Sequence, residues 1–498
     1  MSTDGTSPRP LLAGVAKADI TGSPAEQTED PLYAAVDAAR GTDRLYVTAL
    51  VLRDEATTIA LVSVDAVAIA EIGSIDDGYL VNVRTQLGAD PGIEAAHVLV
   101  NASHCHGVVC ADVEARTVQA VREAAAGLEP VHVGVGRGHE DRIMENRRLQ
   151  LLDGREADVR RAYSLPADEQ IASVGPVDPD IGILRLDRTD GRALALVYHF
   201  ACHPILGVAD GGNTADLSGF ASRAIETGLG EGATALFLQG CCADINPVRY
   251  RDVNDPPDAE AMGERLGLSA LRAAREIDCD GDASLHVISE HIDLPREDLT
   301  GHIDALEAEQ KRLLGSLRPT ALNLKSFVSL SVRHSLSARY PADASHRYLH
   351  EQSLGRDDLT RLDETNRGLL DQYGDNVQIM EQLTRIQVNL GLLKRHQERY
   401  IQAGGRPVAA EVIGLRVGPF ALVMFAGELS VQTGLRLKQA SPHEYTCVSG
   451  VSNGYLYYTP TAEQLRNRGG AQEDSDCFVA SEWQGLFEGK ALEILGRL

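Results

Sequence analysis

The sequence predicts an α+β (mixed α/β) fold, and three observations support this prediction. Up to about residue 290, short apolar runs of strand length alternate with longer stretches whose apolar residues recur at helical spacing. From 297 to 403, strand signals become sparse and helical spacing with charged residues in between prevails. After 403 the strand-like runs return. This order is typical of a core of sheets and helices that carries a helical segment inserted into it.

The first part of the chain supplies most of the expected strands. They are apolar runs of five to eight residues, the length of buried strands. We expect strands at 45–52, 58–64, 96–100, 131–135, 181–186, 193–200 and 233–238, with helices at 113–128 and 259–277. The later part predicts helices at 299–314 and 376–400, strands at 411–417, 420–425 and 445–450, and a terminal helix at 483–498.

The strand-rich segment after residue 403 is too short to fold alone. The sequence therefore predicts one domain over 1–498, with 297–403 as a helical insertion within it. The insertion is a candidate lid over a cleft and equally a candidate subunit interface of a homo-oligomer.

Composition narrows the class of partner. The formal net charge of −25 disfavours nucleic acid and anionic membrane, which repel an acidic surface. No stretch has the apolar length of a membrane span, and the N-terminus lacks the charged and apolar regions of a secretory signal. The eight cysteines show neither a disulfide framework nor zinc-finger spacing. We expect a cytoplasmic protein with reduced thiols that acts on a small molecule.

Histidines stand at the ends of two apolar runs. His104 and His106 follow Val98-Leu-Val-Asn-Ala, and His203 follows the run at 193–200. Strand ends that open into Gly or Pro turns expose side chains to a cleft, and alternate residues of a strand share a face. Neutral imidazole is a common zinc ligand, so a metal site is the first hypothesis, with hydrogen-bonded core histidines as the alternative.

Three further segments place polar groups after apolar runs. The turn Ala243-Asp244-Ile-Asn246-Pro247 follows one run, and Gly427-Glu428 follows another. The third segment brings three tyrosines together at Tyr455, Tyr457 and Tyr458. A carboxylate, an amide and phenols are thus available beside the histidines.

Taken in order, these segments resemble the catalytic domain of the neutral (non-lysosomal) ceramidase family and its bacterial relatives. The matching motifs are Ala13–Gly22 with Asp19-Ile-Thr21, Ser103-His104-Cys-His106-Gly107, Asn146-Arg147-Arg148, Gly175-Pro-Val-Asp178-Pro, His203-Pro204, Thr214-Ala-Asp216, Ala243-Asp244-Ile-Asn-Pro, Gly427-Glu428 and Ser452-Asn453-Gly-Tyr455. The resemblance implies stacked β-sheets flanked by helices. On this resemblance we expect a divergent bacterial relative that lacks the family's C-terminal immunoglobulin-like domain and its secretion signal.

The resemblance also implies a zinc ion and its ligands. These ligands are His104, His203, Glu428 and Tyr458, with Tyr455 and Tyr457 as competitors for the role of Tyr458. Zinc lowers the pKa of a bound water from about 15.7 toward about 7 and polarises a carbonyl.

The expected catalytic residues are His106, Asn246 and Asp244. His106 is expected to assist proton transfer or to bind the oxyanion. Asp244 is an acidic neighbour, with a role in holding its turn as the alternative. Asn246 stands where the family carries its catalytic serine, and an amide cannot be an acyl nucleophile, although its NH₂ can donate to an oxyanion. The family has a second active-site tyrosine, but the corresponding position in this sequence falls among Gly469-Gly470-Ala471, so one oxyanion donor is missing.

These departures make ceramide a poor expectation for the substrate. The sequence predicts a zinc-dependent hydrolase that cleaves an amide bond, or else an ester or lactone, of a soluble small molecule by metal-activated water. The alternative is an amide-forming or acyl-transferring enzyme of a biosynthetic pathway that uses the same zinc site. A third class is a metal-binding protein without catalysis.

Overall fold

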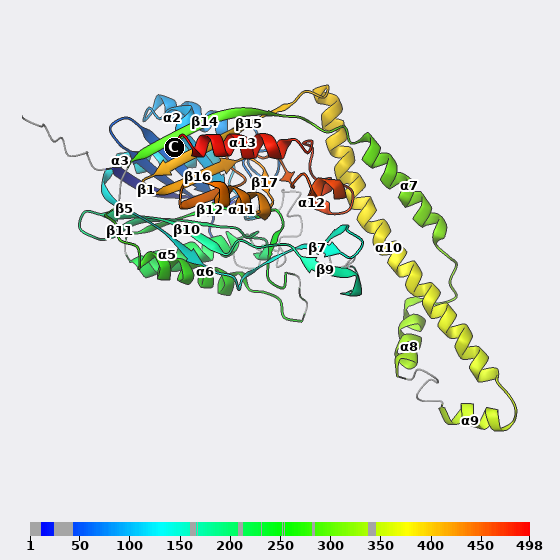
Figure 1. Cartoon of the computed structure of the whole chain (residues 1–498). Coiled ribbons are helices and arrows are strands. Elements are labelled where there is room, and N and C mark those ends of the chain that lie inside the picture. The colour runs from blue at the N-terminus through cyan, green and yellow to red at the C-terminus, as the bar shows by residue number, and fades with distance from the viewer. Residues whose placement is uncertain are drawn as a thin grey trace, which may run out of the picture.

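Two β-sheets stacked face to face form the centre of the molecule (Figure 1). The computed structural model describes residues 11–23, 43–159, 166, 168–207, 213–230, 232–250, 252, 254–280, 284–336 and 345–498. Residues 1–10, on which the secretory-signal expectation rests, lie outside these ranges.

The larger sheet has eight strands and the smaller has four. In spatial order the larger sheet runs β12 (Thr234–Gln239), β11 (Ala193–Phe200), β10 (Asp180–Arg188), β5 (Glu129–His139), β1 (Leu12–Asp19), β2 (Tyr46–Arg53), β3 (Thr58–Val64) and β4 (Val98–Ala102). The smaller runs β14 (Leu285–Leu294), β15 (Val408–Val417), β16 (Phe420–Phe425) and β18 (Tyr445–Ser449). Short ladders join β13 (Ile245–Pro247) to β6 (Met144–Asn146), β17 (Glu428–Leu429) to β19 (Tyr458–Thr459), and β7 (Arg148–Leu151) to β8 (Glu156–Asp158) and β9 (Ile171–Val174).

Alternate side chains of the central strands face different layers, as the pleat requires. In β16, Leu422 and Met424 pack between the sheets, whereas Val423 and Phe425 face the opposite way. Every residue of β16 is buried, which explains its unbroken apolar sequence. The inner layer is therefore an apolar core that holds the strand ends at fixed positions.

Helices cover the outer faces of both sheets (Figure 1). They are α2 (Tyr79–Ala89) and α3 (Val113–Ala126) beside β1–β4, α5 (Asp216–Leu229) and α6 (Ala259–Ala274) beside β10–β12, and α11 (Val431–Ala440) and α13 (Trp483–Leu495) beside the smaller sheet, with the short α12 (Gln472–Ser475) nearby. The predicted fold class, with stacked sheets flanked by helices, is confirmed.

A long helical arm leaves the sandwich between β14 and β15, which are neighbouring antiparallel strands (Figure 1). It consists of α7 (Thr300–Ser316), α8 (Leu324–Ser335), α9 (Ser345–Ser353) and α10 (Asp358–Ala403). The helix expected at 376–400 is the last part of α10, which has 46 residues. Its earlier turns bury few side chains, so they lack the apolar spacing that reveals a helix in a sequence. No described helix is long and apolar enough to cross a membrane.

Candidate metal centre

The site lies where the carboxyl ends of several strands meet. Strands β3 and β4, β11 and β12, and β16 and β18 form parallel pairs. His104 follows β4, His203 follows β11, Cys242 follows β12 and Glu428 follows β16. Because parallel neighbours end at the same edge, residues far apart in the sequence converge there.

A buried asparagine ties three of these strand ends together. Asn101 of β4 donates from Nδ2 to the Gly450 carbonyl at 2.8 Å and to Oγ of Ser452 at 2.9 Å. Its Oδ1 accepts from the backbone N–H of Gln239 at 2.8 Å. Asn101 thus links β4 to β12 and to the turn after β18. These buried hydrogen bonds fix the spacing of the loops that carry the site.

Two imidazoles direct the same nitrogen at one carboxylate oxygen. Oε2 of Glu428 lies 3.4 Å from Nε2 of His104 and 3.2 Å from Nε2 of His203. The other ring nitrogens face backbone carbonyls, with Nδ1 of His104 2.6 Å from the Val67 oxygen and Nδ1 of His203 3.1 Å from the Ile245 oxygen. Because a carbonyl only accepts, Nδ1 carries a proton in each ring, and Nε2 of the neutral ring is the nitrogen that keeps a lone pair.

The local electrostatics favour the ligand-competent protonation states. Burial, followed by the nearby Arg147 guanidinium, lowers the pKa of His203 to about 4, so its imidazole is neutral at pH 7. Burial opposes ionisation of Glu428, but the positive charge and N–H donation that the His104 and His203 rings supply when protonated lower the pKa of its carboxyl well below the ordinary value. A metal ligand must be deprotonated, and the pKa shifts of His203 and Glu428 favour this state in both groups.

This donor set fits zinc. Three lone-pair atoms converge without a proton between them, an arrangement that a cation stabilises. Tetrahedral ligands at about 2.0 to 2.1 Å from zinc lie about 3.3 Å from one another, and the separations of 3.2 and 3.4 Å between Glu428 and the histidines match this value. Both histidines also have the backbone-bonded Nδ1 that is usual for metal-binding imidazoles.

Backbone strain is concentrated around the same loops. His104 has a φ of +64°, and Val451, Asn453 and Tyr457 have φ values of +49°, +54° and +56°. Residues with side chains rarely adopt this conformation, and such strain is common where a loop aims functional groups. The turn after β18 therefore has the backbone character of a functional loop.

The three tyrosines of that turn have different surroundings. The Tyr455 hydroxyl donates to Oε1 of Glu428. The Tyr458 hydroxyl accepts from Nη2 of Arg147 at 3.4 Å, and Tyr458 pairs in register with Glu428 between β17 and β19. The Tyr457 ring lies against His396 of α10, with ring centroids 4.8 Å apart, and its hydroxyl donates at 3.4 Å to Glu71 of the body. Tyr455 and Tyr458 therefore adjoin the candidate metal ligands, whereas Tyr457 contacts the base of the arm.

Asn246 has its amide orientation fixed by Arg147. Nη1 of Arg147 donates to Oδ1 of Asn246 at 3.0 Å, and Arg can only donate, so the amide NH₂ points the other way. That Nδ2 is buried and has no hydrogen-bond partner among the described residues. A buried donor without a partner is unusual and is available to a developing negative charge.

Of the other two predicted catalytic residues, His106 lies beside a candidate metal ligand, whereas Asp244 is bonded to the start of α11. The His106 ring is half-buried, and its centroid lies 5.6 Å from that of His104. Asp244 accepts from the backbone N–H of Val431, the first residue of α11, at 2.8 Å and from the Asn146 amide at 3.4 Å. These contacts suit a residue that holds its turn against α11.

Two residues of the site had no role assigned from the sequence. Cys242 is buried, and its sulfur and one ring nitrogen each of His104 and His203 lie within 4.8 Å of one another. Its position just after an apolar strand was the same signal that drew attention to the histidines. Arg147 is buried between Asn246 and Tyr458, and the sequence marks it only as part of the matching motif Asn146-Arg147-Arg148, without a role.

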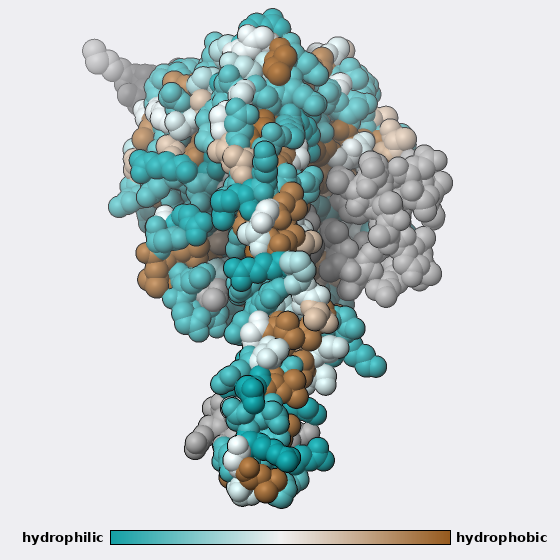
Figure 2. Space-filling view, turned by 90° about the vertical axis from the view of Figure 1, so that its right-hand side faces the viewer, coloured by the Kyte–Doolittle hydropathy of each residue, from teal (hydrophilic) through white to brown (hydrophobic). Residues whose placement is uncertain are grey.

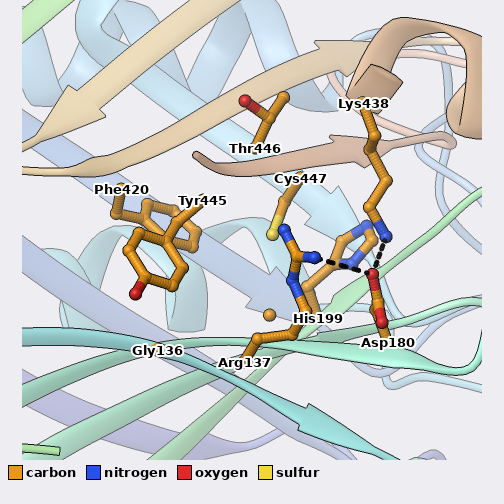
Figure 3. A pocket seen from close by; sticks show the side chains of 10 residues that line it. Gly136, Arg137, Asp180, His199, Phe420, Lys438, Tyr445, Thr446 and Cys447 are labelled. Carbon is orange, nitrogen blue, oxygen red and sulfur yellow. Dashed lines mark hydrogen bonds and ion pairs between the residues drawn. The ribbon is translucent and has the colours of Figure 1, made fainter. Parts of the chain in front are cut away.

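His199, a further buried histidine, connects the two sheets and does not belong to the candidate metal site. Nε2 of His199 in β11 is 2.9 Å from the Val448 carbonyl of β18, and burial lowers its pKa to about 4. Figure 3 shows Lys438 and Arg137 reaching Asp180 beside it, at 2.9 and 3.5 Å. Because β18 leads into the tyrosine turn, these contacts help to position that turn.

Fold and site together define an α+β sandwich of two sheets with a buried His–His–carboxylate centre at its strand ends. No protein-family model and no curated protein sequence matches the chain. The crystal structure of the neutral ceramidase from Pseudomonas aeruginosa does match, with a TM-score of 0.62, 17% identity and coverage of 98% of this chain and 75% of that one. A ceramidase complexed with C2 matches with a TM-score of 0.61 and 17% identity, over 98% and 76%. The chain thus has the fold of the neutral ceramidases, which confirms the resemblance at the level of fold.

Proposed function

We propose that this protein is a zinc-dependent hydrolase that cleaves an amide bond of a soluble small molecule. The observation that carries the proposal is the convergence of Nε2 of His104 and Nε2 of His203 on Oε2 of Glu428. The shared fold adds support, because the neighbours of known structure are ceramidases. Zinc held there would supply Lewis acidity and an acidified water as nucleophile.

The chain's own residues would stabilise the charge that develops on the substrate carbonyl. The free Nδ2 of Asn246 is the donor best suited to an oxyanion, and Arg147 fixes its direction. His106, half-buried beside His104, is the candidate for proton transfer to the leaving amine. Asp244 acts as a positioning residue through Val431.

The fourth protein ligand is either Tyr458 or Cys242. Family resemblance favours the phenol, whereas proximity to both imidazoles favours the thiol. Burial raises the pKa of the Cys242 thiol well above its usual range, but a bound metal deprotonates a coordinating thiol outright. Cobalt substitution separates the two, because a thiolate ligand produces an intense near-ultraviolet charge-transfer band. That band should vanish in Cys242→Ser if the thiol is a ligand.

Turnover of a panel of soluble N-acyl amides by zinc-loaded protein tests the proposal. Esters and lactones belong in the same panel. Activity should follow zinc content and disappear in His203→Ala, whereas His199→Gln, which changes a buried histidine away from the centre, should retain it if folded. Full activity of metal-free protein would exclude the proposal.

The alternative is acyl transfer or amide formation at the same centre. Asn246 leaves this alternative open, because without a serine at this position no acyl-enzyme forms there, and either water or an amine would attack the carbonyl directly. Adding primary amines to the hydrolysis assay discriminates the two, because a transferase would yield the new amide in preference to the free acid. We also propose a cytoplasmic location, since all eight cysteines are free thiols.

A further inference from the structure

The arm, described over residues 297–336 and 345–403, projects well beyond the sandwich (Figure 1). Helix α10 alone, with 46 residues, is about 69 Å long at 1.5 Å per residue. Its C-terminal part is tied to the body by Arg399 with Glu71 at 2.7 Å and by His396 with Asp476 at 2.7 Å. Towards the other end, α8 has no buried residue at all. The outer arm thus offers its surface to solvent on several sides.

Exposed apolar side chains are concentrated on this arm. It holds 11 of the 16 large apolar residues that are exposed in the described part of the chain, with exposed fractions of 40% to 70%. Figure 2 shows brown side chains recurring along its length. On α8 and its C-cap they recur every fourth residue, which places them in one stripe: Leu324, Val328, Val332 and Leu336. Phe327, on another side of α8, stacks on Tyr373 of α10 with ring centroids 4.4 Å apart.

An open groove lies beside α8 on the same arm. It is wide open to solvent and is lined by Thr320, which precedes α8, and by Tyr373, Val377, Met380 and Glu381 of α10. Val377 and Met380 are themselves among the exposed apolar residues. The arm therefore presents an apolar helix and an apolar groove next to each other, which is the pairing that a two-fold symmetric contact needs.

Charge is distributed so that the arm complements a copy of itself. Residues 318–342 contain four Lys and Arg and no acidic residue, whereas residues 343–381 contain nine Asp and Glu and four Arg. The whole insertion has 15 acidic and 14 basic residues, a net charge of −1, so the other 391 residues carry −24 of the −25. The sandwiches of two copies therefore repel each other, whereas their nearly neutral arms do not. A contact through the long arms keeps the two sandwiches farther apart than the screening length of about 8 Å.

The apolar area is sufficient for a stable dimer. A fully exposed side chain of this size offers roughly 100 Å² of apolar surface, and the 11 partly exposed residues of the arm therefore offer roughly 600 Å² in total. A standard interface buries about 800 Å² per partner, of which somewhat over half is apolar. The six such residues on α8 and in the α10 groove offer roughly 330 Å² of this area. Leu349, Leu354 and Leu362, farther out on the arm, bring the total to roughly 500 Å², which meets that share.

We propose that the arm is a homodimer interface, in which α8 of each subunit lies in the α10 groove of the other. The occupant of the groove is thus a second copy of this chain, and Lys325 and Arg333 of α8 approach the acidic stretch that includes Glu381 of the partner subunit. This proposal is independent of the metal centre.

Sedimentation velocity on the full-length protein at low micromolar concentration tests the proposal, and the wild type should be a dimer. The double variant Val328→Glu with Val332→Glu should sediment as a monomer with an unchanged circular dichroism spectrum, because these side chains are 50% and 56% exposed. Val81→Glu is the matched control, a 66% exposed valine on α2 of the body, and should remain dimeric.

A charge swap tests the register without disturbing the apolar stripe. Lys325→Glu and Glu381→Lys should each weaken the dimer at least several-fold, and the two together in one chain should restore it. A monomeric wild type, or a dimer that ignores both sets of arm variants, would overturn the proposal. So would a monomer that binds phosphatidylcholine vesicles through the same stripe, which would assign the surface to a membrane.

Discussion

The three tyrosines after β18 offer a matched series at the candidate metal centre, since Tyr→Phe removes a single hydroxyl. The Tyr455 hydroxyl donates to Oε1 of Glu428, while Oε2 of the same carboxylate faces both imidazoles. A hydrogen bond to a charged group contributes about 1.5 to 3 kcal/mol, and 1.4 kcal/mol is a factor of ten. Tyr455→Phe should therefore weaken zinc binding roughly 10 to 100-fold, the range typical of residues that orient a ligand.

The other two tyrosines define the comparison. Tyr457→Phe removes a hydroxyl that faces Glu71 and the arm, so zinc affinity should stay within about threefold of the wild type. Tyr458→Phe should cost well over about 100-fold if its phenol is a ligand, and far less if Cys242 takes that position. Titrating the metal-free proteins with zinc in competition with a chromophoric chelator measures the zinc affinity of all three variants. Urea unfolding checks that each variant is folded. Wild-type affinity in Tyr455→Phe, or an equal loss in Tyr457→Phe, would refute the assignment of the site.

Three further predictions concern other residues. Asn246→Ala should reduce kcat by roughly 100 to 1,000-fold, the contribution of one oxyanion donor, and intact mass after rapid quench should show no acyl-enzyme; an adduct would refute the metal-water mechanism. Asn101→Ala leaves the buried Gln239 N–H unpaired and should lower the free energy of unfolding by about 2 to 3 kcal/mol in urea titrations. Burial raises the pKa of Asp65 to about 6, so the protonated form is favoured in the native state, and stability from this group is full below pH 4 and lost as pH rises through 6. Between pH 4 and 7 the free energy of unfolding of the wild type should therefore fall by about 3 kcal/mol more than that of Asp65→Asn. Identical pH profiles of the two proteins would contradict the role given to burial.

Much of the fold was accessible from the sequence because burial imposes a pattern. Strands β3, β11 and β16 begin and end at the predicted residues, since each is apolar throughout or nearly so. Strand β14 escaped prediction because most of its residues are only partly buried or exposed, and its polar residues interrupt the signal. The start of α10 at Asp358 escaped for a related reason, because a helix that leaves the body needs no continuous apolar face.

The sequence by itself determined which residue types stand at strand ends, and that was enough to single out His104, His203 and Glu428. Only the tertiary structure decided their distances, the carbonyl partners that fix each imidazole, and the separate surroundings of Tyr455, Tyr457 and Tyr458. It alone brought Cys242 and Arg147 to the centre. The physical reason is that strand formation depends on local apolar pattern, whereas the convergence of loops depends on long-range sheet pairing and on buried contacts such as those of Asn101, which no local pattern encodes.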